Sequence, residues 1–261
     1  MEKEKSTLPV MLKSTAIKNR FTEILGNNAA SFISSILTIF KENEKLRKCE
    51  PASILTAAAQ AANLKLPILP QLGYAYIIPY YDYKTQSYVA NFQLGYKGLL
   101  QLAMRTNQFK NIHTTEIYEG QIKSFNCITG EIELGERVSD TVIGYAAYFQ
   151  LLNGFSKTLY MSIADMEQHA KSFSETYRNE KTRQYSTWTK NFHAMAKKTV
   201  LKKLLTTFAP TSIETQNNVE ATAMQESTIT VEPSDDDFVL EQIDIETGDV
   251  LSDTAQDQNQ C

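Results

Sequence analysis

The sequence predicts an α+β fold, in which helices and an antiparallel, hairpin-rich sheet occupy separate stretches of the chain. Apolar residues recur every three to four positions in the first sixty residues and again after residue 162, as in amphipathic helices. Between residues 73 and 161 the period falls to two, as in half-buried strands. The resulting order is helices, hairpin, helix, several strands and helices, which differs from the regular strand–helix alternation of a parallel sheet.

The first expected elements are helices. Residues Ser14–Asn43 show a helical apolar pattern that is interrupted near Gly26. Pro51 suits the first turn of a second helix, which runs to about Asn63 through an alanine-rich centre that permits close packing. The apolar stripes of the first region motivate the hypothesis that it forms contacts between subunits; they consist of Ile17, Phe21, Ile24, Phe32, Ile36 and Ile39.

The middle of the chain is expected to form strands around one helix. Residues 74–80 and 88–94 predict a hairpin that turns at Asp82–Thr85, with Tyr76, Tyr80 and Phe92 mostly in the core. A helix at about Gly95–Thr106 follows. The later predicted elements are strands at 110–118, 142–151 and 156–161, a hairpin at 122–134 turning at Thr129-Gly130, a helix from Ser162 with Asp165 in a capping box, and a helix over 185–208.

The charge divides the chain into a basic body and an acidic tail. The net charge is −4, yet residues 213–261 contain 13 acidic residues and no Lys or Arg, which leaves residues 1–212 with a net charge of +9. We therefore expect an N-terminal helical segment over 1–45, a binding core over 46–212 and a mostly disordered tail over 213–261. Within the tail, residues 235–240 join three aspartates to apolar residues, which fits either a solvating tail or a docking segment that competes for the basic body.

Catalytic and cofactor signatures are missing from the sequence. Gly95-Tyr96-Lys97-Gly98 is too short for a nucleotide-binding phosphate loop, and the three histidines lack metal-ligand spacing. We expect neither cofactor nor metal nor enzymatic activity, and we expect the three widely spaced cysteines to be reduced thiols of a cytoplasmic protein without a membrane span. A two-metal nuclease is the remaining enzymatic alternative, and its best candidates are Glu116, Glu119, Glu131, Glu133 and Glu136, which we interpret as solvated hairpin residues.

Two basic regions are the candidate binding surface. On the helix after the hairpin, Lys97, Gln101 and Arg105 form a polar stripe that fits either phosphate contacts or a solvated face. Residues 178–203 contain eight basic residues against the single acid Glu180, which favours phosphate binding over contact with a membrane or an acidic partner. The apolar face of the last helix changes sides beyond Thr199, so this helix must kink or pack on two sides.

The ordered set of motifs resembles the RecT family of phage and prophage recombinases over about residues 46–210. The motifs are Pro51-Ala52-Ser53-Ile54, Gly73–Tyr80, Gln93–Leu100, Ile117-Tyr118-Glu119-Gly120, Gly144–Tyr148, Trp188-Thr189 and Met195–Leu204. The resemblance implies single-stranded DNA binding without ATP, annealing of complementary strands into duplex, and homo-oligomeric rings or helical filaments with DNA in a basic groove. It also implies a phage exonuclease as partner and a role of the C-terminal region in partner contacts. Host single-strand-binding protein is a further candidate partner of that region.

The predicted DNA contacts are basic residues on the two helices and the strands between them. Lys110 and Lys123, on the strands, are the weaker candidates. Tyr96 and Trp188 are candidates for base stacking, although the apolar stripe that contains Trp188 favours core packing. A coating or scaffold protein that acts mainly through its tail is the alternative function. The helix candidates are Lys97, Arg105, Lys190, Lys197, Lys198, Lys202 and Lys203.

Overall fold

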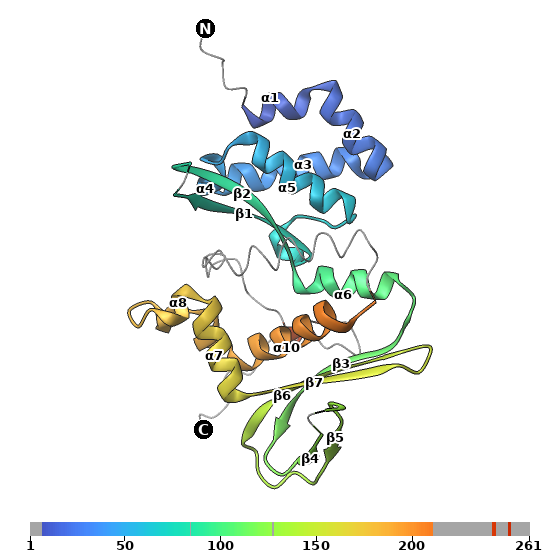
Figure 1. The fold of residues 1–261 in the computed structure, drawn as a ribbon. Coiled ribbons are helices and arrows are strands. Elements are labelled where there is room, and N and C mark those ends of the chain that lie inside the picture. The colour runs from blue at the N-terminus through green and yellow to red at the C-terminus, as the bar shows by residue number, and fades with distance from the viewer. Residues whose placement is uncertain (1–6, 84, 127, 211–241, 244–249, 252–261) are drawn as a thin grey trace, which may run out of the picture.

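The computed structural model describes residues 7–83, 85–126, 128–210, 242–243 and 250–251. Its helices and antiparallel sheets confirm the predicted α+β class (Figure 1). Two short strands, β8 (Gln242–Ile243) and β9 (Val250–Leu251), pair with each other. The rest of the predicted acidic tail and two of the three cysteines lie outside the described residues, while Cys49 is a buried free thiol.

The N-terminal region is helical, and its predicted break at Gly26 is confirmed. Gly26 has a φ of +56°, a conformation that glycine adopts without steric cost. The aromatic rings of Phe21 and Phe32 lie 5.7 Å apart, so the apolar stripes pack within this chain. The elements are α1 (Leu8–Lys13), α2 (Thr15–Leu25), the 3₁₀ turn η1 (Gly26–Asn28), α3 (Ala29–Glu42), α4 (Glu44–Arg47) and α5 (Pro51–Asn63), of which α1 and α4 were not predicted.

The predicted aromatic hairpin consists of β1 (Ala75–Asp82) and β2 (Ser87–Leu94), reached through η2 (Pro70–Leu72). Its buried face pairs Ile77 with Phe92 and packs on α5, whose alanines let the helix approach closely. Tyr76 and Tyr80 lie on the opposite face and are half-buried, so placing them in the core with Phe92 was wrong. The alternation of the strand defines two faces, and only tertiary packing selects the covered one.

The central helix and the remaining strands follow the predicted order. Gly98 lets α6 (Tyr96–Arg105) approach the backbone of Tyr74 so closely that a Cβ atom would collide with its carbonyl oxygen. A three-stranded antiparallel sheet has the order β3-β6-β7, and the predicted second hairpin forms a separate small sheet. The strands are β3 (Phe109–Tyr118), β4 (Ile122–Phe125), β5 (Ile132–Leu134), β6 (Val142–Leu151) and β7 (Ser156–Ser162).

The C-terminal helices begin with the predicted capping box, in which Ser162 and Asp165 cap α7 (Ile163–Phe173). The single helix predicted over 185–208 is wrong in its first part. Ser186 caps the short helix α9 (Thr187–Lys190), and Asn191 then leaves the helical conformation, with φ −133° and ψ 53°, before α10 (Phe192–Phe208). The connecting elements are α8 (Glu175–Arg178) and η3 (Arg183–Tyr185).

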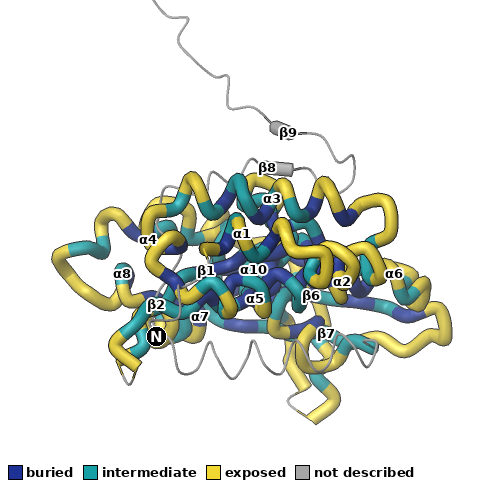
Figure 2. Tube along the Cα trace, turned by 90° about the horizontal axis from the view of Figure 1, so that it is seen from above, coloured by how far each residue is buried: buried dark blue, intermediate teal, exposed yellow. Residues whose placement is uncertain are grey.

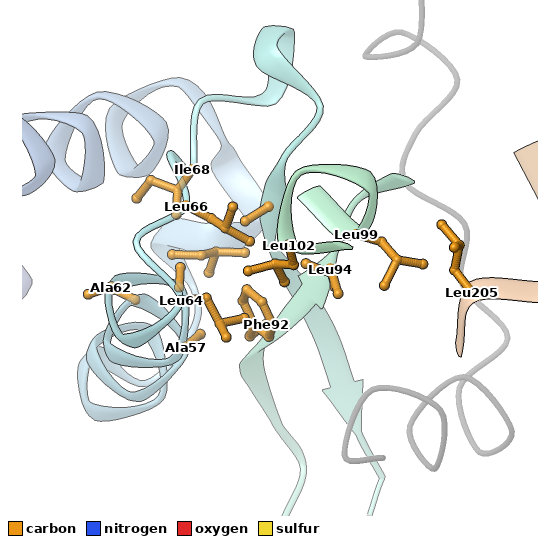
Figure 3. Close-up of a cluster of buried hydrophobic side chains, with 14 of the residues drawn as sticks. Ala57, Ala62, Leu64, Leu66, Ile68, Phe92, Leu94, Leu99, Leu102 and Leu205 are labelled. Carbon is orange, nitrogen blue, oxygen red and sulfur yellow. The ribbon is translucent and has the colours of Figure 1, made fainter. Parts of the chain in front are cut away.

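Helix α10 packs on two sides, as its shifting apolar face predicted. The sheet β3-β6-β7 lies on one side and α6 on the other (Figure 1). Leu99 of α6 and Leu205 of α10 point toward each other in the close-up of the core (Figure 3). α10 therefore joins the sheet to the hairpin half of the molecule.

Most of the buried apolar side chains of the described residues form one cluster from Leu8 to Leu205. Seen from above, buried residues lie toward the middle of the molecule, and exposed residues lie on its outer loops and on the outward sides of the helices (Figure 2). The N-terminal helices thus share a core with the rest of the chain, and their apolar stripes are largely used within it. The domain boundary near residue 45 and the contacts of these helices with other subunits stay predictions. Because the apolar stripes are used within the chain, they no longer support the predicted subunit contacts.

Candidate nucleic-acid interface

The lysines of α10 point in several directions. Lys198 and Lys202 are four residues apart and therefore share one face of the helix. Lys197 turns toward the sheet, where its Nζ lies 3.2 Å from Oε1 of Glu116 on β3. Lys203, in the C-terminal half of the helix, is exposed. The pKa of Asp165 is lowered mainly by its hydrogen bonds with Ser162, and the charge of Lys203 lowers it further.

Glu116 is the centre of a polar network between β3, β6 and α10. Its Oε2 accepts a hydrogen bond from the hydroxyl of Tyr118 at 2.9 Å. The pKa of Glu116 is lowered: burial acts to raise it, but the hydrogen bonds from Tyr118 and Lys197 and the charges of Lys197 and His193 outweigh burial. On the facing strand, the hydroxyl of Tyr145 lies 2.8 Å from Nδ1 of His193. Burial is also the main cause that raises the pKa of Tyr145 to about 12.

The three predicted phosphate contacts outside α6 and α10 differ in their surroundings; they are Lys110 on β3, Lys123 on β4 and Lys190 at the end of α9. Lys110 and Lys190 are exposed at the surface. Lys123 is exposed as well, but its Nζ forms an ion pair with Glu133 on the neighbouring strand β5. A phosphate that binds Lys123 must therefore compete with a carboxylate, while one that binds Lys110 or Lys190 approaches an open side chain.

Arg105 and Lys97 lie at the two ends of α6, and Arg105 is bound to neighbouring backbone. The Nη1 and Nη2 atoms of Arg105 donate to the carbonyl oxygens of Leu64 and Lys65, at 2.6 and 3.0 Å, just beyond the end of α5. The stem of Lys97 lies beside Gly73, where φ is +72°. The predicted stripe is therefore no simple solvated face, and the guanidinium of Arg105 has a structural task.

The two candidates for base stacking are packed into the protein. Trp188 is 3% exposed and packs its ring against Phe192 at 5.7 Å. Tyr96 is half-buried against the core, and burial raises its pKa. In this conformation the indole presents no free face to a base, in agreement with core packing.

The acids proposed for a nuclease are distributed among separate partners. Glu116 faces Lys197, Glu133 faces Lys123, and Glu119 accepts from the hydroxyl of Ser139. Within the described ranges, no three His, Cys, Asp or Glu residues are grouped so that they could hold a metal ion. Also within these ranges, no helix is long and apolar enough to cross a bilayer.

Exposed basic side chains accumulate on the segment α8–α10 with little acid between them. Arg178, Lys181, Lys190 and Lys203 are exposed, and Glu180 is the one acid between residues 178 and 203. An accumulation of basic residues of this kind is typical of the class of proteins that bind polyanions.

Similarities to known proteins identify the family of this chain. The model of the RecT family matches residues 30–237. The chain is 42% identical over 221 residues to the uncharacterized protein YqaK of Bacillus subtilis (strain 168), which covers 84% of this chain and 73% of YqaK. It is 27% identical over 212 residues to Protein RecT of Escherichia coli (strain K12), which covers 79% of this chain and 75% of that protein.

The chain belongs to the RecT family, because the family model spans well over half of its residues. The predicted resemblance is confirmed, and the match begins earlier than the motifs suggested, within α3. Membership makes the chain a DNA-binding, single-strand annealing protein of DNA recombination.

The main site feature that the sequence missed is the pairing of Glu116 with Lys197. Sequence reasoning placed Glu116 on a solvated strand face and Lys197 among free phosphate contacts. The two residues are 81 positions apart, and they meet because α10 crosses β3, where Thr114 also donates to the carbonyl oxygen of Lys197 at 3.5 Å. No local pattern signals a contact of this kind.

Proposed function

We propose that this protein anneals complementary DNA strands without nucleotide hydrolysis by holding one strand by its phosphates along the basic surface of α8–α10. Bases that remain exposed then pair with a second strand, so base pairing supplies the sequence specificity. The resulting duplex stays on the same surface. The protein acts in the cytoplasm as an oligomeric ring or filament, so that one strand crosses the basic surfaces of many subunits.

The observation that carries the proposal is the excess of basic residues between residues 178 and 203, where eight Lys and Arg residues stand against the single acid Glu180. Side chains that contact phosphates release condensed counterions from DNA, which favours binding without regard to base sequence. Lys198 and Lys202 supply two such charges on one helical face, one turn apart. Membership in the RecT family supports the same activity.

The partners that we propose are single-stranded DNA, annealed duplex and further copies of this chain. A phage exonuclease would supply the single strands, and the acidic tail is the proposed segment for contacts with it or with a host single-strand-binding protein. The tail carries 13 acidic residues and no basic ones, so it suits a basic protein surface better than DNA.

The test is the annealing rate of two complementary oligonucleotides, one with a fluorophore and one with a quencher, without nucleotide and over a range of salt concentrations. We expect the protein to accelerate annealing, the acceleration to fade as salt rises, and both strands to remain intact. The double variant Lys198→Met/Lys202→Met should bind a single strand more weakly, and its salt dependence should be shallower by about 1.4, since each lost phosphate contact accounts for roughly 0.7.

A matched control is Lys13→Met/Lys18→Met, which removes the same charge from exposed positions of α1 and α2. Equal losses in the two double variants would show that net charge, not the α10 surface, governs binding. Strand binding without faster annealing would favour a coating or scaffold protein, and cleavage that requires magnesium would favour a nuclease.

A further inference from the structure

We infer that Glu116 is an internal competitor for phosphate, which holds Lys197 in the free protein and sets how strongly and how salt-dependently a DNA strand binds. The inference rests on the proposed function, because it concerns one lysine of the same basic surface. It assigns to a carboxylate on the sheet a role in setting the affinity and salt dependence of strand binding.

The contact that motivates the inference joins an anchored acid to a more accessible base. The side chain of Glu116 is 21% exposed, and that of Lys197 is 39% exposed. Oε1 of Glu116 accepts the Lys197 ammonium at 3.2 Å and also lies 4.0 Å from Nδ1 of His193. Partial burial reduces the screening by water and salt, so this pair persists under conditions in which fully exposed pairs contribute little.

The surroundings of Glu116 fix the carboxylate in place. Tyr118 donates its hydroxyl to Oε2, and the guanidinium of Arg137 stacks on the Tyr118 ring with Cζ 3.6 Å from the ring centre. Arg137 is itself held by the carbonyl oxygen of Ser139 at 3.1 Å and by an ion pair with Asp140. The acid is thus braced from the strand and from the loop before β6.

Lys197 has a longer side chain than Glu116, and among the described residues its ammonium has one polar contact, the ion pair with Glu116. Its four-carbon stem carries a compact charge that can move to another oxygen. When a strand approaches, the ammonium of Lys197 therefore exchanges the carboxylate for a phosphate, while Glu116 keeps its hydrogen bond from Tyr118.

The exchange has an electrostatic consequence that is measurable. In the free protein the charge of Lys197 is already compensated, and after the exchange Glu116 remains as an uncompensated negative charge near the strand. One fewer net counterion is then released on binding than the number of phosphate contacts predicts. Glu116 thereby lowers affinity and makes binding less sensitive to salt.

The variant Glu116→Gln tests this, because it removes the charge and keeps an oxygen that can accept from Tyr118. Binding of a fluorescein-labelled oligothymidylate to the full-length protein is measured by anisotropy over a range of salt concentrations. We expect a several-fold increase in affinity at low salt and a salt dependence that is steeper by about 0.7, the value of one phosphate contact on a single strand.

The control with the same charge change is Glu131→Gln. Glu131 is exposed in the β4–β5 hairpin and accepts from the hydroxyl of Thr129, without a basic partner among the ion pairs of the described residues. A double-mutant cycle with Lys197→Met shows whether Glu116→Gln changes DNA affinity through Lys197 or only through the change in net charge. In the Lys197→Met background, Glu116→Gln should change affinity no more than Glu131→Gln does.

The possible outcomes separate the role of Glu116 from the proposed DNA-binding function. Equal effects of Glu116→Gln and Glu131→Gln in the protein that retains Lys197, or a gain in affinity from Glu116→Gln that survives Lys197→Met, would overturn the role of Glu116 while leaving strand binding intact. Absence of strand binding by the unaltered protein would overturn the proposed function and the inference with it. Thermal unfolding of each variant shows whether a loss of affinity reflects a loss of folding.

Discussion

Replacing Arg105 by methionine distinguishes a structural arginine from a DNA contact. The substitution keeps the aliphatic stem and removes the two donors that bind the carbonyl oxygens of Leu64 and Lys65. Hydrogen bonds from charged groups contribute about 1.5–3 kcal/mol each, but Arg105 is partly exposed and water can replace it at the carbonyls. We therefore expect the free energy of unfolding to fall by about 1–2 kcal/mol in total.

The assay is urea unfolding followed by circular dichroism. With a denaturant dependence of about 2–3 kcal/mol per molar urea, the midpoint should fall by roughly 0.5 M. Lys110→Met is the control, because Lys110 is exposed on β3, and it should leave the midpoint unchanged. A normal midpoint for Arg105→Met together with a shallower salt dependence of strand binding would refute the structural role and restore Arg105 as a phosphate contact.

Three further outcomes follow from buried side chains. Leu205→Ala removes a residue that is 1% exposed between α10 and α6, so unfolding in urea should show a loss of about 2–5 kcal/mol, and a loss below 1 kcal/mol would contradict the packing. Trp188, the single tryptophan, should emit at short wavelength and keep its intensity when oligothymidylate binds, whereas strong quenching would indicate base stacking. The pKa of Tyr145 is raised in the folded state to about 12, mainly by burial, from a usual value of 10.0. The stabilisation that the protonated Tyr145 hydroxyl gives the folded state is therefore complete below pH 10 and is lost as the pH rises toward 12. Urea midpoints between pH 9 and 11 should fall less steeply for Tyr145→Phe than for the unaltered protein, and parallel slopes would exclude this contribution.

The sequence by itself determined the elements and their order, because periodicity, turn residues and caps act over a few positions. The capping box at Ser162, the break at Gly26 and the strand at 142–151 were all predictable from neighbouring residues. The motif order was also sufficient to predict the family, since it depends on the sequence alone.

The tertiary structure decided which faces are covered and which charges are compensated. The tyrosine face of β1 proved half-buried because α5 packs on the opposite face, where Ile77 lies. A break at Asn191 separates α9 from α10, where apolar spacing predicted one continuous helix. Arg105 binds backbone carbonyls some forty residues earlier in the chain, and Lys197 meets Glu116 where α10 packs on β3. These contacts join residues far apart in sequence, so a periodic pattern carries no information about them, and only the packing of helices on strands brings the partners together.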